Sequence, residues 1–212
     1  MKVKEIYTGP LYVKTWAFML EERLILVDPG GHDDELLDYI TETSPTSIEI
    51  MLTHGHFDHV GGIPYLFEHY NITHIYIHKN DAFYLGDDAK ENHIKCFSPI
   101  RAERYIQNMK AKFPSATDYI KDGDVINTFR VIETPGHTEG SVCFYNEDEG
   151  ILFSGDTLFR RSRGRTDLLG GDEDKLILSL KKLLSIKDDA IVYPGHGANT
   201  IMIEEKSWIK AL

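Results

Sequence analysis

The chain has 212 residues, of which 42% are hydrophobic and 27% charged, which is typical of one large folded domain and excludes a disordered or fibrous class. Its formal net charge of -11 disfavours binding to nucleic acid or to an anionic membrane. The sequence has no secretory leader pattern and no apolar run of about eighteen residues, which predicts a cytoplasmic protein. Its two cysteines, Cys96 and Cys143, are too few for a disulfide framework, and Cys143 fits a buried strand.

The first part of the chain is expected to alternate short strands with helices. Runs of branched and apolar residues predict strands over residues 2–7, 11–20, 23–27, 48–52 and 72–79, and helical spacing predicts helices over 33–43 and 60–70. The first three strands should form an antiparallel meander, whereas the last strand, helix and strand are typical of a parallel pair. Leu66, Phe67 and Tyr70 are expected on the buried side of the second helix, with His69 at the surface. Asp28 ends the third strand, and it fits either the rim of a site or the cap of the next helix.

The rest of the chain begins with a cover and then becomes rich in strands. Helical pieces are predicted over 81–90 and 98–112, and His78 and His93 are interpreted as structural or exposed. Strand patterns follow over 119–126, 128–138, 140–150, 151–159 and 190–197, with helices over 172–184 and 200–212. Trp208 and Ile209 should face inward on the last helix.

Four potential metal ligands lie within six residues, in the run His54-Gly55-His56-Phe57-Asp58-His59. In an extended segment His54 and His56 project to the same side, so they can meet one ion. A turn at Phe57 would direct Asp58 and His59 toward a second position nearby. Three imidazoles and a carboxylate at these offsets favour a metal site over a solvated polar loop, and they suit zinc, iron or manganese better than magnesium or calcium.

Three further strands end in a glycine followed by a potential ligand. These are VIETPGHT with His137, ILFSGDT with Asp156 and IVYPGHG with His196. Glycine allows a sharp turn and a close approach of backbone where several strand ends converge. The pattern therefore predicts that four strand ends bring their ligands to one place.

The simplest assignment uses seven protein ligands for two ions. His54, His56 and His137 would hold one ion, Asp58, His59 and His196 the other, and Asp156 would bridge both. A carboxylate can span ions ~3.5 to 4 Å apart, and a water between them would lose a proton readily near neutral pH. Asp58 would also act catalytically by accepting the proton of that nucleophile.

The motifs THGHFDHVGG, PGHT, SGDTLF, GRTD and YPGHG, in this order, resemble the metallo-β-lactamase superfamily and are most similar to its glyoxalase II (hydroxyacylglutathione hydrolase) branch. The resemblance implies an α/β fold, an αββα sandwich of two mixed β-sheets packed face to face with helices on the outer faces. It supports the seven ligands position by position. Residues 1–212 are expected to form one such domain, without the C-terminal helical domain that helps full-length glyoxalase II to hold glutathione.

The resemblance implies a binuclear metallohydrolase that acts on small acyl thioesters by attack of a metal-bridging hydroxide. Two divalent ions are expected, zinc first, with iron or manganese as alternatives. The competing function is that of a persulfide dioxygenase with one non-haem iron, because the same ligand positions serve that reaction. A nuclease is disfavoured by the acidic charge balance, and a β-lactamase by the absence of an export signal.

Four arginines lie within six residues, close after Asp156 in the sequence. Guanidinium groups match carboxylates, so Arg161, Arg163 and Arg165 are candidates for binding an anionic small-molecule substrate. The alternative is that Arg165 pairs with Asp167 to fix the loop, while Arg160, Arg161 and Arg163 are solvated.

Overall fold

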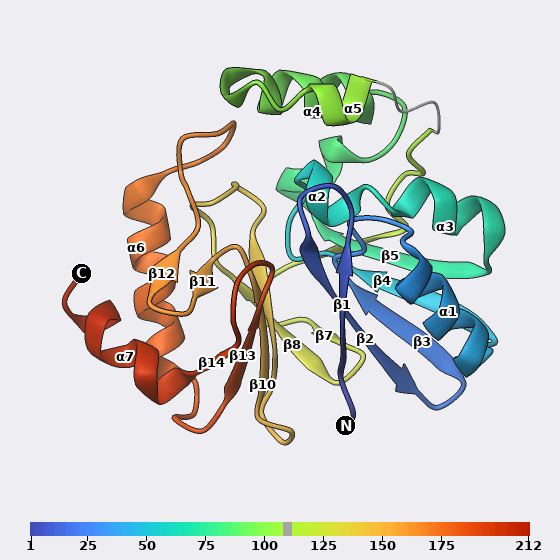
Figure 1. Ribbon diagram of the computed structural model, residues 1–212. Coiled ribbons are helices and arrows are strands. Elements are labelled where there is room, and N and C mark those ends of the chain that lie inside the picture. The colour runs from blue at the N-terminus through green and yellow to red at the C-terminus, as the bar shows by residue number, and fades with distance from the viewer. Residues whose placement is uncertain (108–111) are drawn as a thin grey trace.

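Two six-stranded β-sheets pack face to face, and helices cover the outer face of each sheet (Figure 1). The computed structural model describes residues 1–107 and 112–212. Three apolar layers result, one between the sheets and one beneath each set of helices. The predicted αββα sandwich of two mixed sheets is therefore confirmed.

The first sheet is built almost entirely from the N-terminal half of the chain. Its strands lie in the order β1 (Lys4–Thr8), β2 (Val13–Leu20), β3 (Arg23–Val27), β4 (Ser47–Met51), β5 (Ile72–His78) and β6 (Asp118–Ile120). The pairs among β1, β2 and β3 are antiparallel, and those from β3 to β6 are parallel. Both the meander and the parallel β4–β5 pair agree with the sequence pattern.

The second sheet comes from the C-terminal half. In sequence order its strands are β7 (Val125–Ile126), β8 (Phe129–Glu133), β9 (Val142–Asn146), β10 (Ile151–Gly155), β13 (Ile191–Pro194) and β14 (Thr200–Ile201). They lie in the order β14, β13, β10, β9, β8 and β7, where β10 and β13 pair in parallel and the other neighbours are antiparallel. A small hairpin of β11 (Leu158–Phe159) and β12 (Ser162–Arg163) follows β10.

Helices cover both sheets and one end of the sandwich. The α-helices are α1 (Asp34–Thr43), α2 (Phe57–Val60), α3 (Ile63–His69), α4 (Ala89–Phe97), α5 (Arg104–Gln107), α6 (Glu173–Lys182) and α7 (Met202–Lys210). Short 3-10 helices span Lys79–Tyr84, Ser98–Ile100 and Leu183–Ser185. In Figure 1, α1 and α3 lie beside the first sheet, α6 and α7 beside the second, and α4 with α5 over the end. Asp172 directly precedes α6, and its side chain accepts a hydrogen bond from the backbone N–H of Lys175 at 3.0 Å, as an N-cap does.

Aromatic rings fill the layer between the sheets. Phe18 of the first sheet stacks on Phe153 of the second, with ring centroids 6.0 Å apart, and Phe129 packs against both. These side chains are fully buried, and burying each stabilises the fold by roughly 1.5–3 kcal/mol. The layer holds the two sheets in the register that brings their strand ends together.

The structure corrects the helix predicted over 60–70. It is divided into α2 and α3 because Gly61 and Gly62 lie between them and pack against the backbone of Gly30 and Gly31, where a Cβ would not fit. Leu66 is buried and His69 exposed as expected, but Phe67 is 51% exposed, so its predicted burial is wrong.

Two further predictions of elements need correction. The strand expected over 119–126 is divided between the sheets, because the chain turns at Gly123, where φ is +86°, and leaves β6 to enter β7. Residues 200 and 201 form β14 rather than the start of a helix. The cover consists of shorter pieces than expected, and part of the helix predicted over 98–112 lies outside the described residues.

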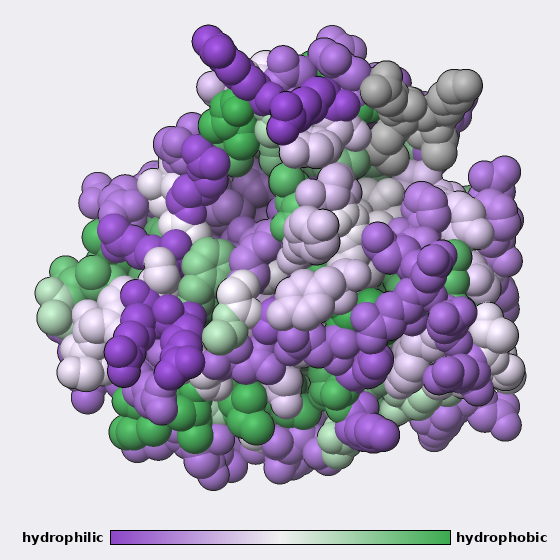
Figure 2. Space-filling model, viewed as in Figure 1, coloured by the Kyte–Doolittle hydropathy of each residue, from purple (hydrophilic) through white to green (hydrophobic). Residues whose placement is uncertain are grey.

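The described helices do not include one that is long and apolar enough to cross a membrane. Figure 2 shows a face on which polar side chains predominate and apolar ones form separate small areas.

Candidate metal centre

Side chains from both sheets meet at the end of the sandwich that α4 and α5 cover. They come from the loop after β4, from α2, and from the segments that directly follow β8, β10 and β13. The structure brings together all seven residues that the sequence predicted as ligands, namely His54, His56, Asp58, His59, His137, Asp156 and His196. Each of the four strand ends contributes at least one of them.

The first set consists of three buried imidazoles. One ring nitrogen from each of His54, His56 and His137 lies within 4.8 Å of the other two. Nδ1 of His56 and Nε2 of His137 face each other at 2.9 Å. These spacings fit three nitrogen ligands around a single ion.

The second set lies beside the first and includes a carboxylate. Ligand atoms of Asp58, His59 and His196 lie within 4.8 Å of one another, with Nε2 of His196 at 3.1 Å from Oδ2 of Asp58. Asp156 lies between the two sets. Its Oδ2 is 3.6 Å from Nε2 of His137, and its Oδ1 is 3.4 Å from Nε2 of His59.

The polar atoms at the centre fit a pair of metal ions. Nε2 of His54, Nε2 of His59 and Oδ1 of Asp156 are buried and have no hydrogen-bond partner in the described part of the chain. A buried polar atom without a partner costs about 1–3 kcal/mol, so three around one point favour a ligand that satisfies them together. Imidazole nitrogens with carboxylate oxygens are the donor set of zinc, iron and manganese.

The surroundings of the centre shift the pKa values of its histidines in different directions. Burial, with a smaller effect of neighbouring imidazoles, holds the pKa of His54 and His56 well below the ordinary value, so both are neutral and able to bind a metal. For His59 burial acts in the same direction, but the nearby carboxylates of Asp156 and Asp58 outweigh it and raise the pKa well above that value.

The two carboxylates remain charged despite their burial. Burial alone would raise the pKa of Asp58, but His59 and His196 lower it to about 2. The pKa of Asp156 is likewise well below its ordinary value, because His59 and the neighbouring imidazoles outweigh burial. The centre therefore presents two anionic side chains at neutral pH.

Asp28 belongs to this centre and does not cap the following helix. Its Oδ1 accepts a hydrogen bond from the backbone N–H of Thr53 at 2.8 Å, and its Oδ2 accepts from the Thr53 hydroxyl at 2.6 Å and from Nδ1 of His59 at 3.0 Å. Because the Thr53 hydroxyl donates to Asp28, its oxygen accepts from Nδ1 of His54 at 3.1 Å. This network leaves Nε2 of both histidines directed at the centre. The position that precedes α1 is Asp33.

Asp81 is a buried residue of the centre that the sequence analysis did not identify. Its carboxylate accepts hydrogen bonds from the backbone N–H of Gly55 at 2.8 Å and of Gly140 at 2.8 Å, and from the Thr138 hydroxyl at 2.7 Å. It thus joins the loop of His54 and His56 to the loop of His137. A signal was available, since Asp81 follows the end of β5 by three residues, as His54 follows the end of β4.

Close backbone approach explains two of the glycines beside the ligands. Gly155 has a φ of +49°, and a Cβ there would lie 2.6 Å from Cβ of Thr53. At Gly195 a Cβ would lie 2.5 Å from Oδ1 of Asp156 and 2.6 Å from Cε1 of His59. Larger residues would therefore push the strand ends of the two sheets apart.

A pocket of 210 Å³ opens over the centre. Apolar side chains form much of its wall, namely Leu11, Phe97, Ile100 and Leu168, beside ligands of both sets and Arg165. The pocket therefore offers an apolar wall next to the metal ligands and one guanidinium group among its described lining residues.

The three candidate arginines lie in different surroundings. Arg165 lines the pocket, and its guanidinium forms two hydrogen bonds, of 2.6 and 2.7 Å, with Asp167, so the predicted pair is confirmed. Its backbone carbonyl accepts from Nδ1 of His137 at 2.7 Å. Arg163 pairs with Glu173, whereas the side chain of Arg161 is exposed, and neither is among the described residues that line this pocket.

The remaining histidines lie outside the centre. Nε2 of His78 is 3.0 Å from a Glu133 carboxylate oxygen. His93 is fully buried between aromatic rings of the cover, so it is structural rather than exposed.

A sandwich of two mixed sheets with His and Asp side chains at one end is the architecture of a class of metal-dependent hydrolases. The chain belongs to the metallo-β-lactamase superfamily, whose sequence profile matches residues 8–196.

Three similar proteins extend this comparison. Hydroxyacylglutathione hydrolase GloC of Haemophilus influenzae is 32% identical over 192 residues, which cover 88% of this chain and 85% of that protein. The crystal structure of the B3 metallo-β-lactamase BLEG-1 superposes with a TM-score of 0.82 at 31% identity and 97% coverage of both chains. The structure of TTHA1623, in a di-iron-bound form, gives a TM-score of 0.79 at 33% identity, covering 96% of this chain and 97% of that one.

Proposed function

We propose that this protein is a binuclear metallohydrolase that cleaves small acyl thioesters, in the manner of a hydroxyacylglutathione hydrolase. The observation that carries the proposal is the second ligand set of Asp58, His59 and His196, which is complete beside the first and shares Asp156 with it. The similarity to GloC supports the thioester as the substrate class.

Different residues of the centre would have different roles in this reaction. Two ions bound by the seven ligands would supply a nucleophilic hydroxide at neutral pH and would polarise the thioester carbonyl. Asp58, whose carboxylate is charged at neutral pH, would orient the attacking water by accepting a hydrogen bond from it. Leu11, Phe97 and Leu168 exclude bulk water from the acyl group, which strengthens every electrostatic contact at the carbonyl.

The metals of this proposal are divalent transition ions. Neutral imidazoles with carboxylates suit zinc, which remains the first candidate, and iron and manganese have the same ligand preferences. The relative TTHA1623 has a structure in a di-iron-bound form, so two irons are a specific alternative for this centre.

The substrate is a small molecule, and its acyl arm is the part that Arg165 can contact. The guanidinium lines the pocket and is partly exposed although it is paired with Asp167. A carboxylate on the acyl arm would share this guanidinium with Asp167, which agrees with the expectation of an anionic thioester.

The competing reaction is oxidation of a persulfide at a single iron. The first set and Asp156 would suffice for it, and the second set would then have no metal to bind. The second set favours two ions, because it brings a carboxylate and two imidazoles within 4.8 Å of one another, a donor set suited to a metal ion.

Metal content and substrate turnover together test the proposal. The protein is purified without added zinc, its metals are counted per chain, and it is assayed with S-lactoylglutathione, simpler thioesters, a persulfide and the β-lactam nitrocefin. We expect two ions per chain and thioester hydrolysis, both lost in Asp156→Ala while the circular dichroism spectrum is retained. One iron per chain with oxygen uptake would replace the proposal by the oxidation reaction, and turnover of nitrocefin alone would replace it by β-lactam hydrolysis.

A further inference from the structure

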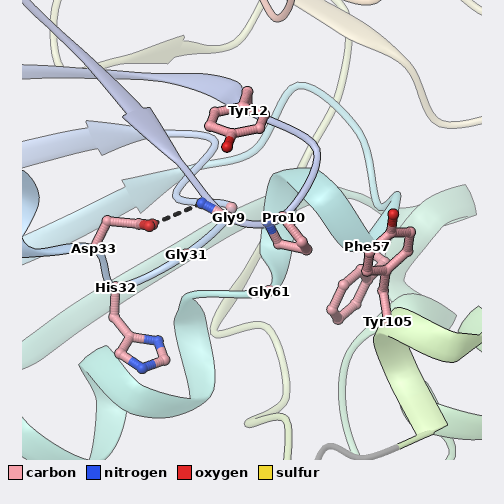
Figure 3. Close-up of a pocket in the computed structure, with 10 residues that line it drawn as sticks. Gly9, Pro10, Tyr12, Gly31, His32, Asp33, Phe57, Gly61 and Tyr105 are labelled. Atoms are coloured by element: carbon pink, nitrogen blue, oxygen red, sulfur yellow. Dashed lines mark hydrogen bonds between the residues drawn. The ribbon is translucent and has the colours of Figure 1, made fainter.

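A second and larger pocket, of 460 Å³, lies next to the metal centre (Figure 3). Aromatic and polar side chains form its wall together with four glycines, and the larger of these residues are Pro10, Tyr12, His32, Asp33, Phe57 and Tyr105. In Figure 2, pale residues of intermediate hydropathy cover the area where Figure 1 places the β1–β2 turn and α2.

The two pockets share a wall. Leu11 lines the pocket over the metal ligands, whereas its neighbours Pro10 and Tyr12 line the larger pocket. Phe57, which follows His56 and precedes Asp58, also contributes to the larger pocket. A substrate that extends from the centre across the β1–β2 turn would therefore enter it.

The volumes of the two pockets indicate which arm of a thioester each pocket would hold. The pocket over the centre has a volume of 210 Å³, roughly that of seven water molecules, which suits the carbonyl and a small acyl group. The larger pocket has a volume of 460 Å³, within the range of about 300–1,000 Å³ typical of sites for whole small molecules. The longer arm, which is the thiol, fits the larger pocket.

Tyr12 presents an exposed aromatic ring at the pocket. Its side chain is 74% exposed, and its φ of +53° belongs to a turn in which its backbone N–H donates a hydrogen bond to the Gly9 carbonyl at 3.2 Å. An aromatic ring held in this way at the mouth of a pocket is suited to cover a ligand.

The charges of the pocket decide what kind of thiol fits. Of its described lining residues none is Lys or Arg, and the charged side chain among them is Asp33, which accepts a hydrogen bond from the backbone N–H of Gly9 at 2.7 Å (Figure 3). The guanidinium of Arg104 lies over the Tyr105 ring, 4.9 Å from its centroid, but does not line the pocket. A thiol with carboxylates would thus meet a carboxylate and no cation.

We infer that the pocket of Tyr12, Phe57 and Tyr105 binds the thiol arm of the substrate, and that this arm is long and uncharged, with amide or apolar groups. This inference rests on the proposed thioester hydrolysis and adds the chemical class of the leaving thiol. Aromatic faces stack on amides and apolar chains, and the negative charge of the substrate, carried on its acyl arm, lies at Arg165 instead.

The test compares three thioesters that share the lactoyl group and differ in the thiol. These are N-acetylcysteamine, which is short and uncharged, pantetheine, which is long and uncharged, and glutathione, which is long and carries carboxylates. We expect kcat/KM to be highest for the pantetheine thioester. Tyr105→Ala and Tyr12→Asn, the second chosen because Asn tolerates the left-handed backbone, should each lower that value roughly three- to tenfold and lower the value for the N-acetylcysteamine thioester less, because its arm is shorter. Tyr119→Ala, at an exposed tyrosine of β6, serves as the matched control.

A binding measurement separates this inference from the proposed hydrolysis. S-methylpantetheine, which has no free thiol to coordinate metal, is titrated into the zinc-loaded protein and followed by NMR. Binding that Tyr105→Ala weakens supports the pocket even if no thioester is hydrolysed. Absence of binding, a preference for glutathione, or an equal loss for all three thioesters in the variants would overturn the inference.

Discussion

The carboxylate of Asp28 accepts a hydrogen bond from Nδ1 of His59 at 3.0 Å, on the side of the imidazole that faces away from the metal centre. The same carboxylate reaches His54 through the hydroxyl of Thr53. One residue at the end of β3 therefore orients a proposed ligand of each ion. Its position couples the geometry of the two sites, since neither imidazole can rotate without breaking the network.

Replacing Asp28 by Ala should lower the affinity for both ions. The loss of a partner that orients metal-binding histidines typically costs about 10- to 100-fold in metal affinity. Affinity is measured by competition with a chromophoric chelator, and Asp28→Asn, which keeps one acceptor, should lie between Asp28→Ala and the wild type. Asp33→Ala, in the same segment, is the control and should bind metal normally. Wild-type affinity in Asp28→Ala would remove the orienting function.

Replacing Asp81 by Ala should affect the two ions unequally. Asp81 joins Gly55, between His54 and His56, to Thr138, which follows His137, so its hydrogen bonds position the first set only. We expect a titration with cobalt, followed by visible absorbance, to show about tenfold weaker binding at one of the two sites. Asp87→Ala, at an exposed aspartate of the same segment, should titrate like the wild type. Equal weakening at both sites would indicate a general loss of stability instead.

Replacing Arg165 by Gln should raise KM for thioesters whose acyl group carries a carboxylate. The guanidinium is partly exposed and shared with Asp167, so an effect of ~3- to 10-fold is expected for an S-succinyl thioester and none for the S-acetyl analogue. The backbone carbonyl that accepts from His137 is unchanged by this substitution. Arg163→Gln is the matched control, because Arg163 pairs with Glu173 and is not among the described lining residues. An equal change for both thioesters would exclude contact with the acyl carboxylate.

Local signals in the sequence were sufficient to predict which His and Asp residues converge, but not the residues that support them. A glycine after an apolar run directly precedes His137, Asp156 and His196, so the pattern alone predicted a convergent site. The contacts of Asp28 depend on how closely β3 approaches the loop after β4, and for that reason its two interpretations remained open. Asp81 lies in a short 3-10 helix of the cover, where no periodic pattern marks the backbone.

The errors in the predicted helices and strands also result from long-range packing, which a local sequence pattern does not encode. The close approach of Gly30 and Gly31 to Gly61 and Gly62 divides one predicted helix into two, α2 and α3. The division of residues 119–126 between two sheets depends on which partner strand is available on each side of Gly123. A pattern of alternating residues predicts a strand, but it does not specify the sheet that the strand joins.

The buried imidazole of His93 should make the stability of the fold depend on pH. His93 stacks on Tyr84 and contacts the ring of Phe57, and neither of its nitrogens has a hydrogen-bond partner among the described residues. Burial lowers its pKa from 6.5 to about 4, so the unfolded chain binds a proton more readily than the folded one. Stability contributed by neutral His93 is therefore complete above pH 6.5 and is lost as the pH falls toward 4. Between pH 7 and 5 the loss amounts to about 2 kcal/mol. Urea unfolding at pH 7 and at pH 5 should show this difference in the wild type and a smaller difference in His93→Phe. The control His69→Phe, at an exposed histidine, should behave like the wild type. An identical pH dependence of the unfolding free energy in all three proteins would contradict the prediction.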